Sequence, residues 1–485
     1  LQDAKGPTTM LKLNSCIQLS KFILTLTLLV FFAKNVSADV RTAQDYLNKL
    51  GYDAGSADGM WGPKTETALK QFLNDNGTSW DGKFDKSEFG LLTATIKKKG
   101  LLEEIVDFGW NIPERPKTKP NDATLAHYLR KDILEGKGIR RDVTGIPSIT
   151  ISGSRLPRKL RYADQTDTNV EKELNKTALI SYLYYENGVV VNDQISPRNR
   201  FGSVFDSKTR LIGNSISKSV VAYLAIHAIC DGYIPNLDHE LSDWPLLKDT
   251  LYNSATLREV MDMRSGDQKF MEYKGGIKGS RFGNPHDRTI KSIMENELSG
   301  STPSAKKFNY NNLNLNVAFN YVIHKSGNDF NRFASRVFQN HIGIEHPVVF
   351  VGKYRDDLTR ETATRANGGA SAHFFASRHD YLRFAIAMLD DWEKNECVGK
   401  HLKDILGNSQ RKGEKPGSGP FANFRGYSSF FHTEFIGFPR RKVLGMDGYG
   451  GQMIWIDFEE RKIVATNAIH MNYNWKKIVS NKIKG

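Results

Sequence analysis

The stretch Leu211–Ile234, LIGNSISKSVVAYLAIHAICDGYI, decides the reading of the whole chain. Its apolar residues recur at helical spacing on nearly every face, which predicts a helix that is buried almost all round. Asp231-Gly232 is typical of a helix end. Ser215 and Lys218 form a Ser-x-x-Lys motif at the start of this helix, one turn apart and on the same side.

This motif has a chemical use. A serine hydroxyl becomes an effective nucleophile when a nearby base takes its proton, and a desolvated lysine amine can be that base. The motif alone is weak, because Ser304–Lys307 and Ser409–Lys412 share its spacing. The alternative interpretation is that Ser215 only caps the helix and that Lys218 is a solvated first-turn lysine.

The composition and the first residues indicate the compartment. The chain has 485 residues, enough for two or three domains, and a net charge of +14. Met10 starts a basic segment that is followed by an apolar run, Phe22–Phe32, and by small residues at Val36-Ser37-Ala38. This order is typical of a secretory signal peptide, with an uncleaved anchor as the alternative. We therefore expect residues 1–38 to be a leader, the protein to be exported to the periplasm or cell wall, and no nucleic-acid partner.

Two cysteines remain beyond this leader. Cys230 lies in the predicted buried helix, so we expect a core thiol, although pairing with Cys397 stays open. No Cys/His cluster has the spacing of zinc ligands. We expect no metal and no cofactor.

Residues 39–95 predict a small helical domain. Two amphipathic segments flank the turn Asp58–Gly62, and Pro63 stands at the start of the second. The segment resembles the three-helix peptidoglycan-binding domain of many cell-wall enzymes. The residues that carry this resemblance are Gln44, Leu47, Leu50-Gly51-Tyr52, Asp58-Gly59, Gly62, Thr65, Ala68-Leu69 and Phe72. It implies a groove for peptidoglycan near Asp58, Trp61 and Thr65, although Trp61 packing the small core is an equal alternative.

The remaining chain predicts a linker and a larger domain. Residues 96–122 are rich in lysine and proline, as linkers are, and the second domain then spans 123–485. Residues 178–193 read as a hairpin that turns at Glu186-Asn187-Gly188, helical patterns follow, and two strands lie at 452–458 and 462–468. This order predicts an α+β fold, with an antiparallel sheet uniting both ends of the domain, flanking helices and a helical subdomain.

The order of motifs in the second domain resembles the serine β-lactamase and penicillin-binding-protein superfamily. It is most similar to the class C-like branch, which includes esterases, D-amino-acid peptidases and 6-aminohexanoate-dimer hydrolases. The matching segments are Ser215-Ile216-Ser217-Lys218, Thr256–Gly266, Tyr310-Asn311-Asn312, Gly368-Gly369 with the helical pattern 377–390, and Gly448–Gln452.

The resemblance implies roles for five residues. Ser215 would attack a carbonyl and form an acyl-enzyme, while Lys218 and Tyr310 share the proton transfers, either one serving as base. Asn312 would orient Lys218 or the substrate amide. The backbone N–H groups of Ser215 and Tyr449 would form the oxyanion hole.

The third motif departs from the family pattern. Penicillin-recognising members have Lys-Thr-Gly or a related cationic triplet, whereas this chain has Met446-Asp447-Gly448. We expect Asp447, Gly448 and Gly450 to line the substrate site, with Asp447 repelling a substrate carboxylate. Other candidates for an anion site are Arg425, Arg440, Arg441 and Lys442.

These features together predict an exported serine hydrolase that acts on a small amide or ester and is held at peptidoglycan by its N-terminal domain. A β-lactam-like compound and a cell-wall peptide both remain possible substrates. The alternative is a catalytically inactive scaffold that binds the cell wall. The sequence leaves the oligomeric state open.

Overall fold

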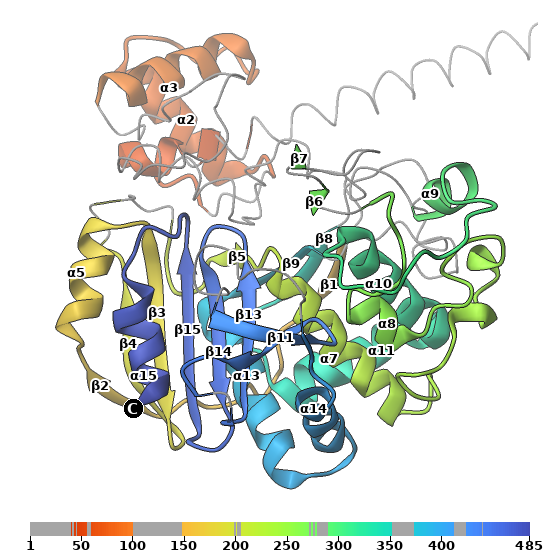
Figure 1. The fold of residues 1–485 in the computed structure, drawn as a ribbon. Coiled ribbons are helices and arrows are strands. Elements are labelled where there is room, and N and C mark those ends of the chain that lie inside the picture. Colours follow the sequence, from red (N-terminus) through yellow and green to blue (C-terminus); the bar gives the residue numbers. More distant parts are fainter. Residues whose placement is uncertain are drawn as a thin grey trace, which may run out of the picture. The chain divides into compact units, whose positions relative to one another are not determined.

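The computed structural model describes residues 40, 43–44, 46–55, 60–99, 148–197, 200, 205–270, 273–274, 277–278, 290–351, 373–411, 423–438 and 440–485. The chain divides into two compact units, Leu1–Phe108 and Gly109–Gly485 (Figure 1). The predicted leader, most of the predicted linker and Gly368-Gly369 lie outside the described residues. In the described part, no helix combines the length and the apolar character needed to cross a membrane.

The N-terminal unit is helical. Residues 46–50 are helical, and α2 (Pro63–Asp75) and α3 (Lys86–Lys98) follow. Proline stands at the first position of α2, where its missing N–H costs no helical hydrogen bond. The core is made of apolar side chains from these segments, including Leu47, Leu69, Phe72 and Leu92. The helices expected from the sequence are therefore present.

A nine-stranded sheet forms the centre of the second unit. Its strand order is β10-β11-β12-β13-β14-β15-β3-β4-β2. All neighbours are antiparallel except β2, which pairs in parallel with β4 at the edge. The strands are β2 (Tyr162–Gln165), β3 (Leu179–Glu186), β4 (Val189–Ile195), β10 (Gln410–Arg411), β11 (Phe424–Ser428), β12 (Phe431–Phe435), β13 (Val443–Gly448), β14 (Gln452–Asp457) and β15 (Lys462–Ala468). The last strand, β15, pairs with β3, so the predicted union of both ends of the domain is confirmed.

Two smaller sheets complete the strands. A four-stranded sheet has the order β1-β8-β9-β5, and β6 and β7 form a hairpin. These strands are β1 (Ser148–Ile151), β5 (Arg210–Ile212), β6 (Tyr273–Lys274), β7 (Ile277–Lys278), β8 (Val348–Val351) and β9 (His373–Ser377). The predicted hairpin of β3 and β4 turns at Asn187 and Gly188, both with positive φ, as a tight two-residue turn requires.

Helices lie on both faces of the large sheet (Figure 1). The helices of this unit are α5 (Thr168–Lys176), α7 (Ile216–Cys230), η2 (Leu241–Asp243), η3 (Pro245–Leu247), α8 (Leu257–Met261), α9 (Ile290–Asn296), α10 (Asn312–Ser326), η5 (Gly327–Asp329), α11 (Phe330–Ser335), η6 (Arg336–Ile342), α13 (Arg378–Lys394), α14 (Cys397–Gly407), η8 (Lys476–Ser480) and α15 (Asn481–Lys484). Residues of α5, η8 and α15 share one apolar cluster with one face of the sheet. The larger cluster unites the other face with α7, α10 and α13. The fold is thus the predicted α+β arrangement, with α7 inside the larger core.

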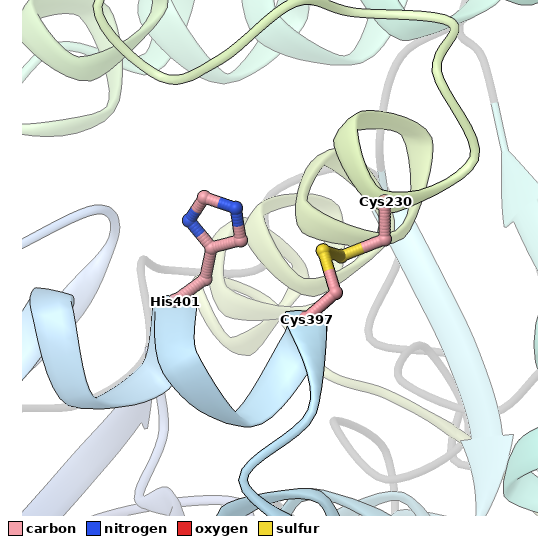
Figure 2. A group of neighbouring side chains, drawn as sticks. All are labelled: Cys230, Cys397 and His401. Carbon is pink, nitrogen blue, oxygen red and sulfur yellow. A yellow bond between two sulfur atoms is a disulfide. The ribbon is translucent and has the colours of Figure 1, made fainter.

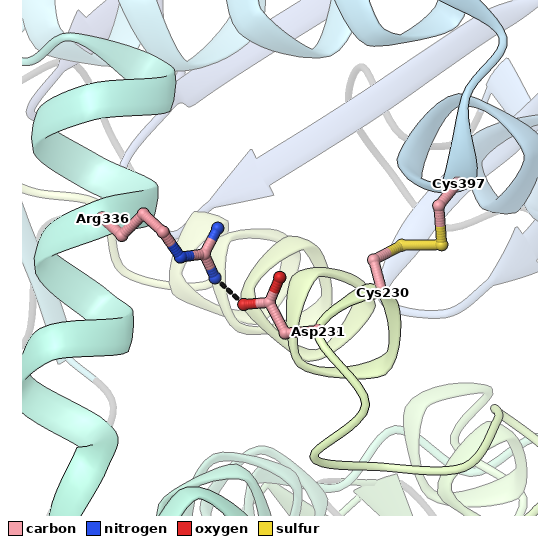
Figure 3. The surroundings of a disulfide bond; sticks show 4 residues. All are labelled: Cys230, Asp231, Arg336 and Cys397. Atoms are coloured by element: carbon pink, nitrogen blue, oxygen red, sulfur yellow. Dashed lines mark ion pairs between the residues drawn. A yellow bond between two sulfur atoms is a disulfide. The ribbon is translucent and has the colours of Figure 1, made fainter.

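Cys230 and Cys397 are bonded to each other. Cys230 ends α7 and Cys397 begins α14, with their Cα atoms 5.8 Å apart (Figures 2 and 3). The expectation of a core thiol at Cys230 was therefore wrong. The helix is buried from Ile216 to Ala228 but reaches the edge of the core at its last turn, where Cys230 is only half-buried and meets an exposed Cys397.

Candidate active site

Ser215 stands immediately before α7, at the end of a tight turn. Asn214 has a φ of +47°, a left-handed conformation that asparagine tolerates better than most residues. The backbone N–H groups of Ser217 and Lys218 donate to the carbonyls of Asn214 and Ser215, both at 3.0 Å, and so start the helix. Ser217 is fully buried, and its hydroxyl accepts a bond from the backbone N–H of Phe374. Ser215 is therefore the more accessible of the two serines in the motif.

Three side chains converge on the Ser215 hydroxyl. The Lys218 ammonium nitrogen lies 3.0 Å from Ser215 Oγ and also donates to Asn312 Oδ1 at 2.8 Å. The hydroxyl of Tyr310 is 2.8 Å from the same Ser215 Oγ. Lys218 is only 2% exposed and lies 4.6 Å from the centre of the Tyr310 ring. Residues separated by almost a hundred positions thus form one group, in which Lys218 Nζ and Tyr310 OH both contact the serine oxygen.

The loop that carries Tyr310 is anchored by its neighbour. Asn311 is buried, and its side chain donates to Asp267 at 2.8 Å and accepts from the backbone N–H of Leu313 at 2.8 Å. The cap of α10 is therefore Asn311. Asp267 also accepts from the backbone of the loop after α8. Neither residue has a role predicted from the sequence, although Asn311 lies inside one segment that carries the family resemblance and Asp267 directly follows another.

The third motif approaches Ser215 through its glycines. Gly448 ends β13, and a Cβ atom at this position would lie 2.2 Å from the carbonyl oxygen of Gly213. Only glycine lets the strand end come this close to the start of α7. Gly450 has a φ of +93°, as the turn into β14 requires. Tyr449 lies in this turn with a side chain that is 63% exposed, and the Asn214 amide donates to its carbonyl at 2.7 Å.

The strand alternation separates Met446 from Asp447. Met446 is fully buried in the cluster that contains α7. Asp447 points the other way, with Val443, which belongs to the opposite cluster. Burial raises the pKa of Tyr473 on that face, and the charge of Asp447 adds to the shift. The structure therefore places Met446, rather than Asp447, on the side of the sheet that faces Ser215.

The alternative anion-site residues lie elsewhere. Arg440, Arg441 and Lys442 precede β13, at the opposite end of that strand from Gly448. Arg441 forms an ion pair with Asp457, and Arg425 is exposed on β11. The structure does not bring these four cations to Ser215.

The N-terminal unit presents one aromatic surface. Trp61 is 37% exposed and stacks on Trp80 and Phe84, with ring centres 5.9 and 5.2 Å away. Thr65 is buried instead, and its hydroxyl is held by Gln44 at 2.9 Å and by the carbonyl of Ala54. Asp58 lies outside the described residues. Of the three predicted binding residues, the structure thus exposes Trp61 and uses Thr65 internally.

Two groups of side chains could hold a metal ion among the described residues. They are Cys230, Cys397 and His401, and His227, His341 and Asp391. Neither group includes Ser215 or the residues that contact its hydroxyl.

Comparison with known proteins shows the family. The Beta-lactamase family matches residues 170–474, and the peptidoglycan binding domain family matches residues 36–92. The chain therefore belongs to the beta-lactamase family, a hydrolase family, and carries a peptidoglycan-binding domain ahead of the hydrolase fold.

Several solved structures are similar to this chain. A protein described as a 6-aminohexanoate-dimer hydrolase from Bacillus anthracis is 16% identical, with a TM-score of 0.49, over 73% of this chain and 95% of that one. FmtA from Staphylococcus aureus is 14% identical, with a TM-score of 0.46, over 68% and 93%. A class C beta-lactamase in complex with cefoxitin is 14% identical, with a TM-score of 0.44, over 66% and 96%. A search of curated proteins found no match.

Proposed function

We propose that this protein is an exported serine hydrolase that acts through an acyl-enzyme on an amide or ester and is held at peptidoglycan by its N-terminal domain. The observation that carries the proposal is the contact of one serine oxygen, Ser215 Oγ, with both Lys218 Nζ and Tyr310 OH. A nucleophile within hydrogen-bond reach of its base is the signature of covalent catalysis. Because Lys218 is buried, this contact is shielded from bulk water.

The first half of the reaction forms the acyl-enzyme. Ser215 Oγ bonds to the carbonyl carbon while its proton passes to the unprotonated amine of Lys218 or to the phenolate oxygen of Tyr310. The negative charge on the carbonyl oxygen would be stabilised by the backbone N–H groups of Ser215 and Tyr449. One such donor is worth on the order of 3 kcal/mol of transition-state stabilisation. The carbon–nitrogen or carbon–oxygen bond then breaks, and the leaving amine or alcohol takes the proton from the same pair.

The second half hydrolyses this intermediate. A water molecule gives a proton to the Lys218 amine or the Tyr310 phenolate while its oxygen bonds to the acyl carbon. The bond from this carbon to Ser215 Oγ then breaks, Oγ takes the proton back from the same base, and a carboxylic acid is released. Asn312 contributes by holding Lys218 through the 2.8 Å bond to its carbonyl oxygen. This bond keeps the amine beside Ser215 while its protonation changes.

The third motif supports a substrate without a carboxylate at the usual place. The cation that receives this carboxylate in penicillin-recognising relatives is replaced by Met446, which is fully buried. A thioether gives an anion no charge complement. We therefore propose an uncharged or amine-bearing amide or ester as substrate, such as part of a cell-wall peptide.

Chemical labelling of the mature protein tests this proposal. We expect a fluorophosphonate to add once, at Ser215, and a penicillin not to add; intact mass and peptide mapping measure both. Ser215→Ala should abolish the adduct. Ser304→Ala is the matched control, because Ser304 begins another Ser-x-x-Lys but donates its hydroxyl to the carbonyl of Gly266.

The other outcomes have definite meanings. A penicillin adduct at Ser215 would contradict the substrate argument from Met446 while supporting the nucleophile. Absence of any adduct would overturn the hydrolase proposal in favour of an inactive scaffold that binds the cell wall.

A further inference from the structure

A second polar cluster lies inside the larger domain, away from Ser215. His227 of α7, His341 of η6 and Asp391 of α13 each offer one ligand atom, and these atoms all lie within 4.8 Å of one another. The Nε2 atom of His341 is 3.0 Å from an Asp391 oxygen and 3.1 Å from the Tyr223 hydroxyl. The two imidazole rings are 4.7 Å apart, centre to centre. Three elements that are distant in sequence therefore present two imidazoles and a carboxylate to one point.

The cluster contains a polar atom whose bonding capacity is unused. His227 is 4% exposed, and its Nε2 has no hydrogen-bond partner in the described part of the chain. A buried polar atom without a partner is rare in folded proteins and asks for an explanation. An imidazole nitrogen that makes no hydrogen bond is available as a metal ligand.

Asp391 adds the second requirement for a metal site, which is negative charge away from water. Its side chain is 5% exposed, and its Oδ2 accepts from the Tyr223 hydroxyl. The partners at this oxygen are a neutral phenol and His341. A divalent cation at this point would compensate a buried carboxylate and occupy the unused nitrogen of His227 at once.

The other candidate cluster does not qualify. Cys230, Cys397 and His401 also lie together, at the junction of α7 and α14 (Figure 2). Zinc needs the thiolate form of cysteine, and here the two sulfur atoms are bonded to each other. The acidic neighbour of this junction, Asp231, is engaged in an ion pair with Arg336 (Figure 3).

We propose that His227, His341 and Asp391 bind a divalent transition-metal ion of the zinc type. Two imidazole nitrogens and one carboxylate oxygen suit this class, whereas calcium and magnesium favour all-oxygen sites. Ligand atoms at about 2.0–2.2 Å from a tetrahedral ion stand about 3.4 Å apart. The ligand atoms here lie at most 4.8 Å apart, so the widest pair closes by up to about 1.4 Å. The Tyr223 hydroxyl or a water is the fourth ligand, and the partly exposed His341 gives the ion its path.

The position of this site defines its role. His227 lies twelve residues after Ser215, or about 18 Å along α7. A metal there would not touch the reacting atoms. It would join the helix that begins at Ser215 to α13 and η6, and so stabilise the fold around that helix. This inference does not depend on the proposed hydrolysis.

Metal titration of the tag-free full-length mature protein tests the site. After treatment with a chelator and dialysis, we expect one equivalent of Co²⁺ to bind with the visible absorption of a tetrahedral site. Zn²⁺ should displace it, and Tm should rise when either ion binds. His227→Phe keeps a planar ring in the core and should weaken Co²⁺ binding at least 100-fold. His401→Gln is the control and should bind as the wild type does.

A second variant covers the case in which His227→Phe does not fold. Asp391→Asn retains an acceptor for the Tyr223 hydroxyl and should bind Co²⁺ at least tenfold more weakly, while its circular dichroism stays that of the wild type. The proposal is overturned if the wild type binds no Co²⁺. It is equally overturned if the folded variants bind as tightly as the wild type, or if His401→Gln alone loses the ion.

Discussion

The side-chain amide of Asn214 donates a 2.7 Å hydrogen bond to the backbone carbonyl of Tyr449. This bond links the turn before α7 to the turn after β13, so it joins the two backbone segments that would supply the proposed oxyanion hole. In the proposed mechanism Asn214 is a positioning residue, because it would hold one N–H donor relative to the other. Asn214 makes this bond from a left-handed backbone conformation, with a φ of +47°.

Asn214→Gly should slow acylation with little loss of stability. Glycine accepts the positive φ but cannot donate to Tyr449, so the second N–H loses its fixed place. We expect kcat/KM for a p-nitrophenyl ester to fall roughly 10- to 100-fold, which is less than the 10²- to 10³-fold cost of removing an oxyanion donor itself. Asn187→Gly is the matched control, since Asn187 has the same φ in an exposed turn of the hairpin β3–β4. Unchanged ester hydrolysis in Asn214→Gly would show that Asn214 does not position the N–H groups of the oxyanion hole.

Tyr310→Phe should slow the reaction of Ser215 without destabilising the fold. The change removes the 2.8 Å contact with Ser215 Oγ but keeps the ring near Lys218. Loss of a proton-transfer group typically costs 10²- to 10⁴-fold in rate. We expect a loss of this size in the fluorophosphonate labelling rate, with Tm almost unchanged. Tyr233→Phe, whose hydroxyl bonds Asp329 away from the site, should label at the wild-type rate; equal rates for both variants would argue against a role for Tyr310.

The aromatic surface of the N-terminal domain should bind peptidoglycan through Trp61. A half-exposed indole stacked on Trp80 offers a rigid apolar face, and such residues dominate binding energies. We expect Trp61→Ala to weaken binding to isolated sacculi roughly tenfold in a pull-down assay. Met60→Ala is the control, because Met60 is the adjacent residue and 72% exposed. If both variants lose the same amount of binding to sacculi, the loss is not specific to the Trp61 indole and follows from removing any exposed apolar side chain.

How much of the fold and of the candidate site could be predicted depends on how far apart in sequence the contacting residues lie. Ser215 and Lys218 lie one helical turn apart, so the spacing alone places them together. Tyr310 is 95 residues from Ser215, and only the family resemblance connected them. Local patterns also gave the hairpin turn at Asn187 and the closing strands, because turn chemistry and alternation act over a few residues.

Facing directions were harder to predict than elements. Alternation shows that Met446 and Asp447 point to opposite sides of β13, but only the packed sheet shows which side α7 covers. Thr65 was predicted to bind peptidoglycan, but it lies on the buried face of α2. Its hydroxyl is tolerated there because the side chain of Gln44 donates a hydrogen bond to it. The Cys230–Cys397 bond spans 167 residues, and no local pattern contains that information.

Removing this bond should destabilise the larger domain. Closing a loop of this length restricts the unfolded chain, and typical losses on removal of a native disulfide are about 2–5 kcal/mol. We expect Cys230→Ser combined with Cys397→Ser to lower the free energy of unfolding by about this amount in urea titrations. Wild type unfolded in the presence of a reductant should match the double variant. If the reductant leaves the free energy of unfolding of the wild type unchanged, the disulfide bond does not contribute to stability.

Asp262 should give the protein an unusual pH dependence. Burial raises the pKa of its carboxyl to about 6, against the opposing effect of a hydrogen bond from the backbone N–H of Ser429. Between about pH 4 and pH 6 the folded state therefore binds more protons than the unfolded state. Stability contributed by this group falls as pH rises through this window and stays low above it.

Asp262→Asn should remove this dependence. The variant should match the wild type near pH 4 and be more stable by about 2–3 kcal/mol at pH 7.5, as measured by urea unfolding. His227, whose lowered pKa acts in the opposite direction, is present in both proteins and cancels in the comparison. Asp164→Asn, at an exposed position, should show no such difference. A variant less stable at pH 7.5 would mean that the charge of Asp262 is favourable.

The place of β15 in the sheet governs when the domain can be completed. This strand comes within the last 25 residues of the chain but lies between β14 and β3, well inside the nine-stranded order. A nascent chain that still lacks it has two separate sheet fragments with unpaired edges, β14 on one and β3 on the other. Such edges are sites of wrong pairing. The domain therefore cannot close until β15 has been synthesised, and a truncation before Lys462 would divide the sheet in two.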